Sequence, residues 1–186
     1  MTKKLTEMSL EELWQLFPIS LVEHQECWGE WYADEAALLS KTIPQPIRIN
    51  HIGSTAISSI WAKPIIDILV EIPKGFELEP IKDLLIKGGY ICMSQSANRF
   101  SFNKGYTETG FVEKVFHVHL RYMGDNDELY FRDYLIEHEN IAREYERLKL
   151  ILWKEFEYDR DGYTNAKTDF VQKYTKKGKL KYKNRY

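Results

Sequence analysis

The chain has 186 residues, of which 44% are apolar and 29% are charged, and its formal net charge is −2. This is the ordinary balance of a soluble globular protein, and no apolar run approaches the roughly 20 residues that cross a bilayer. Cys27 and Cys92 have neither metal-site nor disulfide spacing, and we expect no secretory leader, so the expected location is the cytoplasm.

The first half of the chain predicts helices followed by a sheet. Ser9 and Glu12 form a capping box, which predicts a short helix over 10–16. Apolar and aromatic residues at helical spacing predict a second helix over 22–40. The remaining elements, inferred from alternation, β-branched residues and glycine signals, are strands 47–52 and 65–72, helix 78–87, and strands 90–93, 99–103 and 114–121, with Lys104-Gly105 ending a hairpin arm.

After residue 127 the strand signals disappear. The pattern predicts three successive helices over 127–137, 140–156 and 161–176. We therefore predict an α+β fold in one domain: N-terminal helices over 9–42, a mixed sheet core over 47–121 and C-terminal helices over 127–176.

A basic tail over residues 173–186 carries seven lysines and arginines and no acidic residue. The rest of the chain holds 19 basic and 28 acidic residues, a net charge of −9. The favoured interpretation is a solvated tail that docks on this acidic body. The alternative is a nucleic-acid contact through phosphates, with three tyrosines available to stack.

The stretch HIGSTAISSIWAKPIIDILVEI, residues 51–72, holds the first candidate site. Gly53, Ser54 and Thr55 form a turn that could bind an anion through backbone N–H groups and a hydroxyl, or Ser54 could simply cap a helix. Asp67 follows inside an apolar strand, where a carboxylate needs a partner such as Lys63, or serves as a ligand. Mg²⁺ typically takes one or two carboxylates plus substrate phosphates, which makes Mg²⁺ or Mn²⁺ the expected cofactor.

A second group of polar residues lies further along the predicted sheet. His117 and His119 are two apart on one strand, so they share a face. They are either polar residues on a solvated face, or metal ligands, phosphate donors or an acid/base couple. Arg99 and Lys104 on the preceding strand could add positive charge for an anionic ligand.

These segments resemble the GrpB-like family. The likeness covers roughly residues 22–176 in the same order, and residues 51–72 match the family's signature. The later matching segments are Gly89-Tyr90, Arg99, Lys104-Gly105, His117-Val118-His119, Phe131-Arg132-Asp133-Tyr134-Leu135, Glu144-Tyr145, Leu148-Lys149, Tyr163-Thr164, Ala166-Lys167 and Phe170.

The resemblance implies the nucleotidyltransferase superfamily, with its DNA polymerase beta-like fold and two metals held by carboxylates. Gly53, Ser54 and Asp67 match that motif. Leu69 stands where the second carboxylate is expected, and Ser58-Ser59 replace the usual Pro-Gly. Glu71 shares a face with Asp67 but lies about 7 Å further along the strand, so it reaches a shared metal only if the strand bends. His117 or His119 could stand in for the third carboxylate.

Three functions follow as hypotheses. The first is a metal-dependent nucleotidyltransferase, with Mg²⁺ at Asp67, His117 or His119 as base or ligand, and the ligand's phosphates near Gly53, Ser54, Lys63, Arg99 and Lys104. The second, favoured by Leu69, is a binding module for a nucleotide or phosphorylated metabolite that has lost catalysis. Some relatives are fused to dephospho-CoA kinase, which points to CoA metabolism. The third is nucleic-acid binding through the tail.

Overall fold

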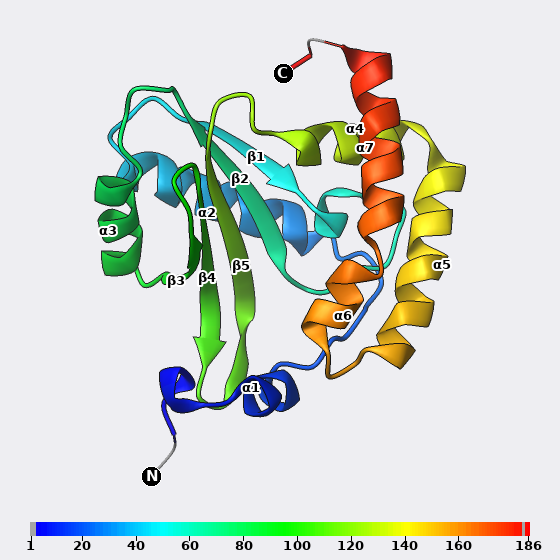
Figure 1. Ribbon diagram of the computed structural model, residues 1–186, viewed down its shortest axis with the longest axis horizontal. Helices are drawn as coiled ribbons and strands as arrows, with labels where there is room; N and C mark the ends of the chain where they lie inside the picture. The colour runs from blue at the N-terminus through cyan, green and yellow to red at the C-terminus, as the bar shows by residue number, and fades with distance from the viewer. Residues whose placement is uncertain (1–2, 184) are drawn as a thin grey trace.

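The computed structural model describes residues 3–183 and 185–186 (Figure 1). Met1, Thr2 and Asn184, the last within the predicted basic tail, lie outside the described residues. The helices are α1 (Leu10–Leu16), α2 (Cys27–Thr42), α3 (Glu79–Lys87), α4 (Asp127–Glu137), α5 (Glu139–Glu155), α6 (Arg160–Asn165) and α7 (Thr168–Tyr182), with short 3₁₀ helices η1 (Leu5–Glu7) and η2 (Ser54–Ala56).

Five strands form one mixed sheet in the order β1-β2-β5-β4-β3. The strands are β1 (Arg48–Ile52), β2 (Ile66–Ile72), β3 (Ile91–Gln95), β4 (Arg99–Thr107) and β5 (Gly110–Tyr122). The central pair, β2 and β5, runs parallel, and every other neighbouring pair is antiparallel. The predicted α+β class, with a mixed sheet, flanking helices and a C-terminal helical segment, is confirmed.

Strand β2 separates the main core from the site. Side chains alternate along a strand, so Ile66, Ile68, Val70 and Ile72 face the main core, where they pack with Trp28 and Leu39 of α2 and Ile81 and Leu85 of α3. Figure 1 shows α2 behind the sheet and α4 to α7 gathered to the right of the sheet. Asp67, Leu69 and Glu71 therefore face away from α2.

The C-terminal helices are joined to the sheet through the segment after β1. Ile57 and Ile60 pack with Leu135, Tyr145 and Tyr174, which come from α4, α5 and α7. This contact brings the turn at Gly53 against α5 and α7, although those helices begin more than 80 residues later. Within the described ranges, no helix has the length and hydropathy that a bilayer crossing requires.

Several predicted boundaries were wrong. The second helix begins at Cys27 instead of residue 22, since Val22 forms an isolated bridge with Ala62. Strand β4 continues past Lys104-Gly105 to Thr107, because a bulge between Lys104 and Tyr106 absorbs Gly105, whose φ is 93°. The predicted helix over 161–176 is two helices, α6 and α7.

The basic tail is largely helical and docks on α4. Lys179, Lys181 and Arg185 pair with Asp127, Glu137 and Asp133 at 2.5, 2.9 and 2.8 Å. Tyr186 also donates its hydroxyl to Asp133. Docking on acidic residues of the body is the arrangement that the favoured interpretation of the tail predicted, within the residues described.

Candidate functional site

Asp67 lies where β1, β2 and β5 meet. In the sheet register it is opposite Ile52 on one side and His117 on the other. Gly53 directly follows β1 with φ 72° and ψ −173°, a conformation that L side chains rarely adopt. A Cβ at Gly53 would clash with Oδ2 of Asp67 and lie 3.1 Å from its Cγ. The glycine is therefore required both by the backbone and by the close approach of the carboxylate.

Two histidines converge on one oxygen of this carboxylate. His117 Nδ1 lies 3.3 Å and His119 Nε2 lies 3.7 Å from Oδ1 of Asp67. Burial by itself would raise the pKa of Asp67. Its hydrogen bonds with His117 and His119, and the positive charge of these rings when acid protonates them, outweigh burial and lower that pKa below its usual range. Asp67 is therefore an anion at neutral pH.

The hydrogen bonds around His117 define its tautomer. Arg160 donates to the hydroxyl oxygen of Tyr106 at 3.2 Å, and that oxygen lies 2.8 Å from Nε2 of His117. The carboxylate of Asp67 only accepts hydrogen bonds, so the ring proton belongs on Nδ1, and Tyr106 donates its hydroxyl proton to Nε2. Burial lowers the pKa of His117, which keeps the ring neutral. Both ring nitrogens are thus occupied by protein contacts.

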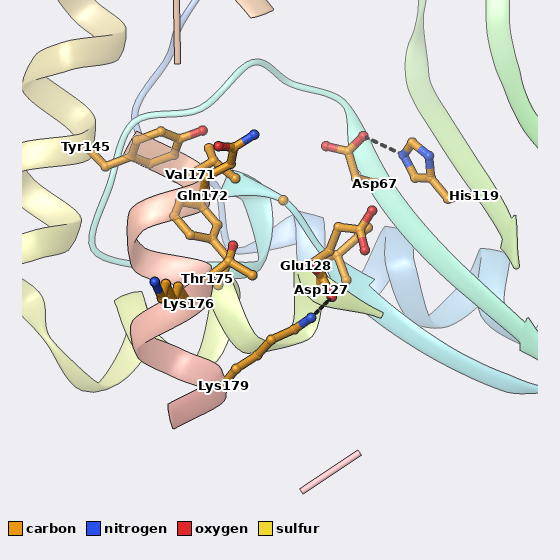
Figure 2. A pocket seen from close by; sticks show the side chains of 13 residues that line it. Asp67, His119, Asp127, Glu128, Tyr145, Val171, Gln172, Thr175, Lys176 and Lys179 are labelled. Atoms are coloured by element: carbon orange, nitrogen blue, oxygen red, sulfur yellow. Dashed lines mark ion pairs between the residues drawn. The ribbon is translucent and has the colours of Figure 1, made fainter. Parts of the chain in front are cut away.

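His119 is placed differently. Its Nδ1 is buried and, among the residues that the structure describes, has no hydrogen-bond partner. It lines a cavity of about 600 Å³, shown in Figure 2 between the sheet and helices α4 and α7. The further lining residues are Ile52, Gly53, Asp67, Asp127, Glu128, Phe131, Tyr145, Val171, Gln172, Thr175, Lys176 and Lys179.

A smaller cavity of about 130 Å³ lies on the other side of Asp67 and holds three lysines. We call it the lysine cavity. Lys63 comes from the loop before β2, Lys149 from α5 and Lys167 from the residue before α7. Its other lining residues are Leu21, Gly53, Ser54, Thr55, Ile65, Asp67, His117, Tyr145 and Tyr163. Because Gly53, Asp67 and Tyr145 line both cavities, the two meet at the carboxylate.

Lys149 is the most buried of the three lysines, with 2% of its surface exposed. It donates to Ser54 Oγ at 3.0 Å and to the carbonyl of Trp61. Lys63 and Lys167 lie over the ring of Tyr163, with Nζ 5.3 and 3.9 Å from its centre. Within the described ranges, none of the three lysines forms an ion pair.

Burial and mutual repulsion weaken the positive charge of this cluster. Burial is the main cause that lowers the pKa of Lys63 to about 8, with Arg160 as a further cause. Burial, followed by repulsion from Lys63, lowers the pKa of Lys149 and of Lys167 to about 7. An anion in the cavity would reverse this effect, since it favours the protonated form of each lysine.

The structure brings together seven of the predicted site residues. Gly53, Ser54, Thr55, Lys63, Asp67 and His117 line the lysine cavity, and His119 lines the larger one. The expected helix after the glycine turn is only the 3₁₀ turn η2. Thr55 is 2% exposed and bonds His51 Nε2 at 3.0 Å, which gives it a structural contact within the turn.

Three predicted residues, Glu71, Arg99 and Lys104, do not line either cavity. Glu71 accepts hydrogen bonds from Gly124 N at 3.2 Å and Asn126 Nδ2 at 3.0 Å, and these bonds hold the loop between β5 and α4.

The two predicted cations on β4 are both paired away from the site. Arg99 pairs with Asp125 through two nitrogens, at 2.5 and 2.7 Å. Lys104 pairs with Glu35 of α2 at 2.6 Å on the opposite face of the sheet. Neither cation is left free to neutralise a ligand near Asp67.

These positions bear on the metal that the resemblance implies. Leu69 is fully buried, and the carboxylate of Glu71 is bound to the loop after β5. Oδ1 of Asp67 faces two imidazoles, and Mg²⁺ prefers oxygen ligands. In the described part of the chain, no group of three or more His, Cys, Asp or Glu residues could hold a metal ion. The donor set does not fit a metal centre built by the protein.

Sequence reasoning missed the residues that complete the site from the C-terminal half. Lys149, Lys167 and Tyr163 line the cavity. Tyr106 bonds its histidine, His117, and Arg160 in turn donates to Tyr106. Lys149 and Lys167 were visible only as members of the segments Leu148-Lys149 and Ala166-Lys167. Helical periodicity reports that a lysine is on a polar face, and it gives no sign that this face meets a turn near residue 54.

The sequence of the chain matches one protein-family model and several related bacterial proteins. The family model described as "GrpB protein" matches residues 18–177. The Glutamate-rich protein GrpB of Alkalihalophilus pseudofirmus is 36% identical over 160 residues, which are 82% of this chain and 91% of that protein. The protein YqkA of Bacillus subtilis is 31% identical over 92% of this chain, which spans about half (51%) of YqkA.

A solved structure agrees with these sequence matches. The crystal structure of conserved protein GrpB from Enterococcus faecalis superposes with a TM-score of 0.74 at 30% identity, and covers 88% of this chain and 99% of that one. The family model and the relatives therefore agree over most of the chain's length. The chain belongs to the GrpB protein family.

Proposed function

We propose that the protein binds a nucleotide or another phosphorylated small molecule, with its phosphate groups between the Gly53-Ser54 turn and the three lysines. The observation that carries this proposal is the lysine cavity itself, in which Lys63, Lys149 and Lys167 surround a space bounded by one carboxylate, that of Asp67.

The energetic cost of the cluster supports the proposal. Burying a positive charge is costly unless a partner compensates it. Within the described residues the three lysines have rings, a hydroxyl and a carbonyl as partners, but no ion pair. A phosphate group supplies negative charge and several acceptor oxygens at once, and lysine is a regular phosphate ligand.

Family membership supports a nucleotidyltransferase-like protein, without naming its substrate. The larger cavity beside Asp67 offers room for the rest of a ligand whose phosphates occupy the lysine cavity. Leu69 and the loop contacts of Glu71 favour a second candidate, a module that binds such a ligand without transferring a nucleotidyl group. The metal predicted at Asp67 is not part of either proposal.

A thermal-shift screen of nucleotides, CoA precursors and pyrophosphate tests the binding. We expect at least one phosphorylated compound to raise the melting temperature and Lys167→Met to remove that rise. Lys177→Met is the matched control, because Lys177 also lies over a tyrosine ring, that of Tyr174 at 5.1 Å, on the exposed side of α7. An unchanged shift in Lys167→Met would contradict the proposal. Release of pyrophosphate from a bound triphosphate would favour transfer over the binding module.

A further inference from the structure

We infer that the phosphate groups of the ligand bind in the lysine cavity without a divalent metal ion, and that Lys63, Lys149 and Lys167 supply the positive charge. This inference rests on the proposed function. It adds two points: the ligand carries two or more negative charges, and its binding needs no metal ion. It runs against the metal-bound site that the family resemblance implies.

The first observation behind this inference is the sign of the charges around the lysine cavity. With all three lysines protonated they carry three positive charges, against the single negative charge of Asp67, and His117 is neutral by its hydrogen bonds. In a carboxylate cage the protein is negative and a metal ion must reverse the sign before a phosphate can enter. Here the protein lining already has the sign that attracts a phosphate.

The carboxylate is the second step. Oδ1 of Asp67 faces His117 and His119, and Oδ2 packs against the backbone of Gly53. A bridging metal would need oxygen ligands beside Asp67. In the lysine cavity the other polar groups are one imidazole, neutral hydroxyls and three ammonium groups, so Asp67 is its single carboxylate, and an ammonium repels a metal ion.

The arrangement of the lysines is the third step. They come from a loop of the sheet region, from α5 and from the junction before α7, so they face the cavity from separate directions. Lys149 is tied to Ser54 Oγ, which fixes an ammonium and a hydroxyl beside each other. Such a cradle offers several donors to one compact anion, as phosphate oxygens require.

The ligand class follows from charge and size. Three ammonium groups are matched by an anion of two or more negative charges, such as a diphosphate or the end of a triphosphate. The lysine cavity, at about 130 Å³, is much smaller than the adjoining 600 Å³ cavity. The ligand therefore places its phosphates in the small cavity and any larger group in the adjoining one.

Titration calorimetry with inorganic pyrophosphate tests this directly, with one set in EDTA and one in excess Mg²⁺. We expect binding in EDTA, at an affinity within about threefold of that in Mg²⁺. Lys63→Met and Lys167→Met should each weaken binding in EDTA by about 10- to 100-fold, the usual worth of a hydrogen bond to a charged group. Lys177→Met should bind like the wild type.

Asp67→Asn separates the two explanations further. If lysines alone hold the phosphate, removing the negative charge of Asp67 strengthens pyrophosphate binding by a few fold. If a metal bridges Asp67 and the phosphate, the same variant weakens it. Lys63 and Lys167 are only partly buried and methionine keeps their length, so these variants report on binding even if substitution of buried Lys149 prevents folding.

The outcomes are distinct. Binding that appears only with Mg²⁺, or that Asp67→Asn weakens, overturns the inference and leaves the proposed function standing. No binding of pyrophosphate, nucleotides or CoA precursors in either condition overturns both. If pyrophosphate binds only to exposed lysines on the surface, Lys177→Met weakens binding as much as Lys63→Met and Lys167→Met do. That result also overturns the inference.

Discussion

Lys149 and Ser54 are 95 residues apart in the sequence, and Lys149 Nζ donates a 3.0 Å hydrogen bond to Ser54 Oγ. The same ammonium group also donates to the carbonyl of Trp61, whose N–H donates to the Glu146 carboxylate at 2.7 Å. Helix α5 is thus connected to Ser54 and to Trp61 in the segment between β1 and β2. This connection gives the turn at Gly53 its place beside the C-terminal helices.

The close approach of Gly53 and Asp67 predicts a large effect of Gly53→Ala. The positive φ and the clash with the carboxylate should together lower the free energy of unfolding by about 1–3 kcal/mol or more. Gly75→Ala is the control, because Gly75 also has a positive φ, 105°, but open space around its Cβ position. Urea unfolding measures both variants, and equal losses would show that the contact with Asp67 contributes nothing.

The lowered pKa values of the three lysines predict how ligand affinity depends on pH. Below about pH 7 the lysines are charged and pyrophosphate binds best. Between pH 7 and 9 the ligand-free protein loses these protons, so binding must take protons up and affinity should fall. Calorimetry from pH 6 to about 9.5 measures this fall, which should be shallower in Lys167→Met.

The same lysines should make the ligand-free protein more stable, not less, as pH rises. The pKa of lysine in the unfolded chain is near 10.5, so between about pH 7 and 10.5 the unfolded chain binds more protons than the folded one. The contribution of these lysines to the free energy of unfolding therefore rises with pH across that window. The measurement is the difference in the free energy of unfolding between the wild type and Lys167→Met across this pH range. A difference that falls as pH rises would contradict the lowered pKa values.

The hydrogen-bond chain through Tyr106 predicts a specific tautomer of His117. In ¹⁵N NMR spectra we expect a neutral ring with the proton on Nδ1, and Tyr106→Phe should shift the Nε2 resonance because its donor is gone. Tyr106→Phe should also cost about 1 kcal/mol of stability. Tyr122→Phe, which removes a 3.0 Å hydrogen bond to Phe76 O at a distant loop, should leave the His117 spectrum unchanged.

Glu71 offers a test of the metal-ligand role predicted from its position on β2. Glu71→Ala leaves the N–H of Gly124 and the amide of Asn126 without their buried acceptor, which should cost about 2–4 kcal/mol. Pyrophosphate affinity of the folded variant should equal that of the wild type. A selective loss of ligand binding, without a loss of stability, would restore the metal-ligand role.

The contacts of Arg185 and Tyr186 with Asp133 predict the effect of shortening the tail. Burial by itself would raise the pKa of Asp133, but Tyr186, Arg185 and Arg132 lower it below 3.8. That stabilisation is present above about pH 4 and is lost as pH falls through the folded-state pKa. Removing residues 185–186 should therefore lower stability at pH 7, and the difference from the wild type should shrink in acid. A difference that stays constant down to pH 2 would exclude this ionic contribution.

The sequence determined the type and order of most elements, though not all of their boundaries, and the sheet side of the site. Alternation along residues 65–72 was enough to place Asp67, Leu69 and Glu71 on one face, because side chains on a strand alternate whatever surrounds them. The spacing of His117 and His119 put both on one face for the same reason. Local chemistry also identified Gly53, since a glycine before Ser-Thr at the end of a strand is typical of a tight turn.

Only the tertiary structure decided which charges line the cavity beside Asp67. Lys104 and Arg99 are closer in sequence to the histidines than Lys149 and Lys167 are, yet they pair with Glu35 and Asp125 away from the site. Lys149 and Lys167 enter the cavity because α5 and the start of α7 pack against residues 53–61. A sequence pattern reports the face of a helix or strand on which a residue lies, but the partner of that face is chosen by long-range packing, and in this protein the packing made the site cationic.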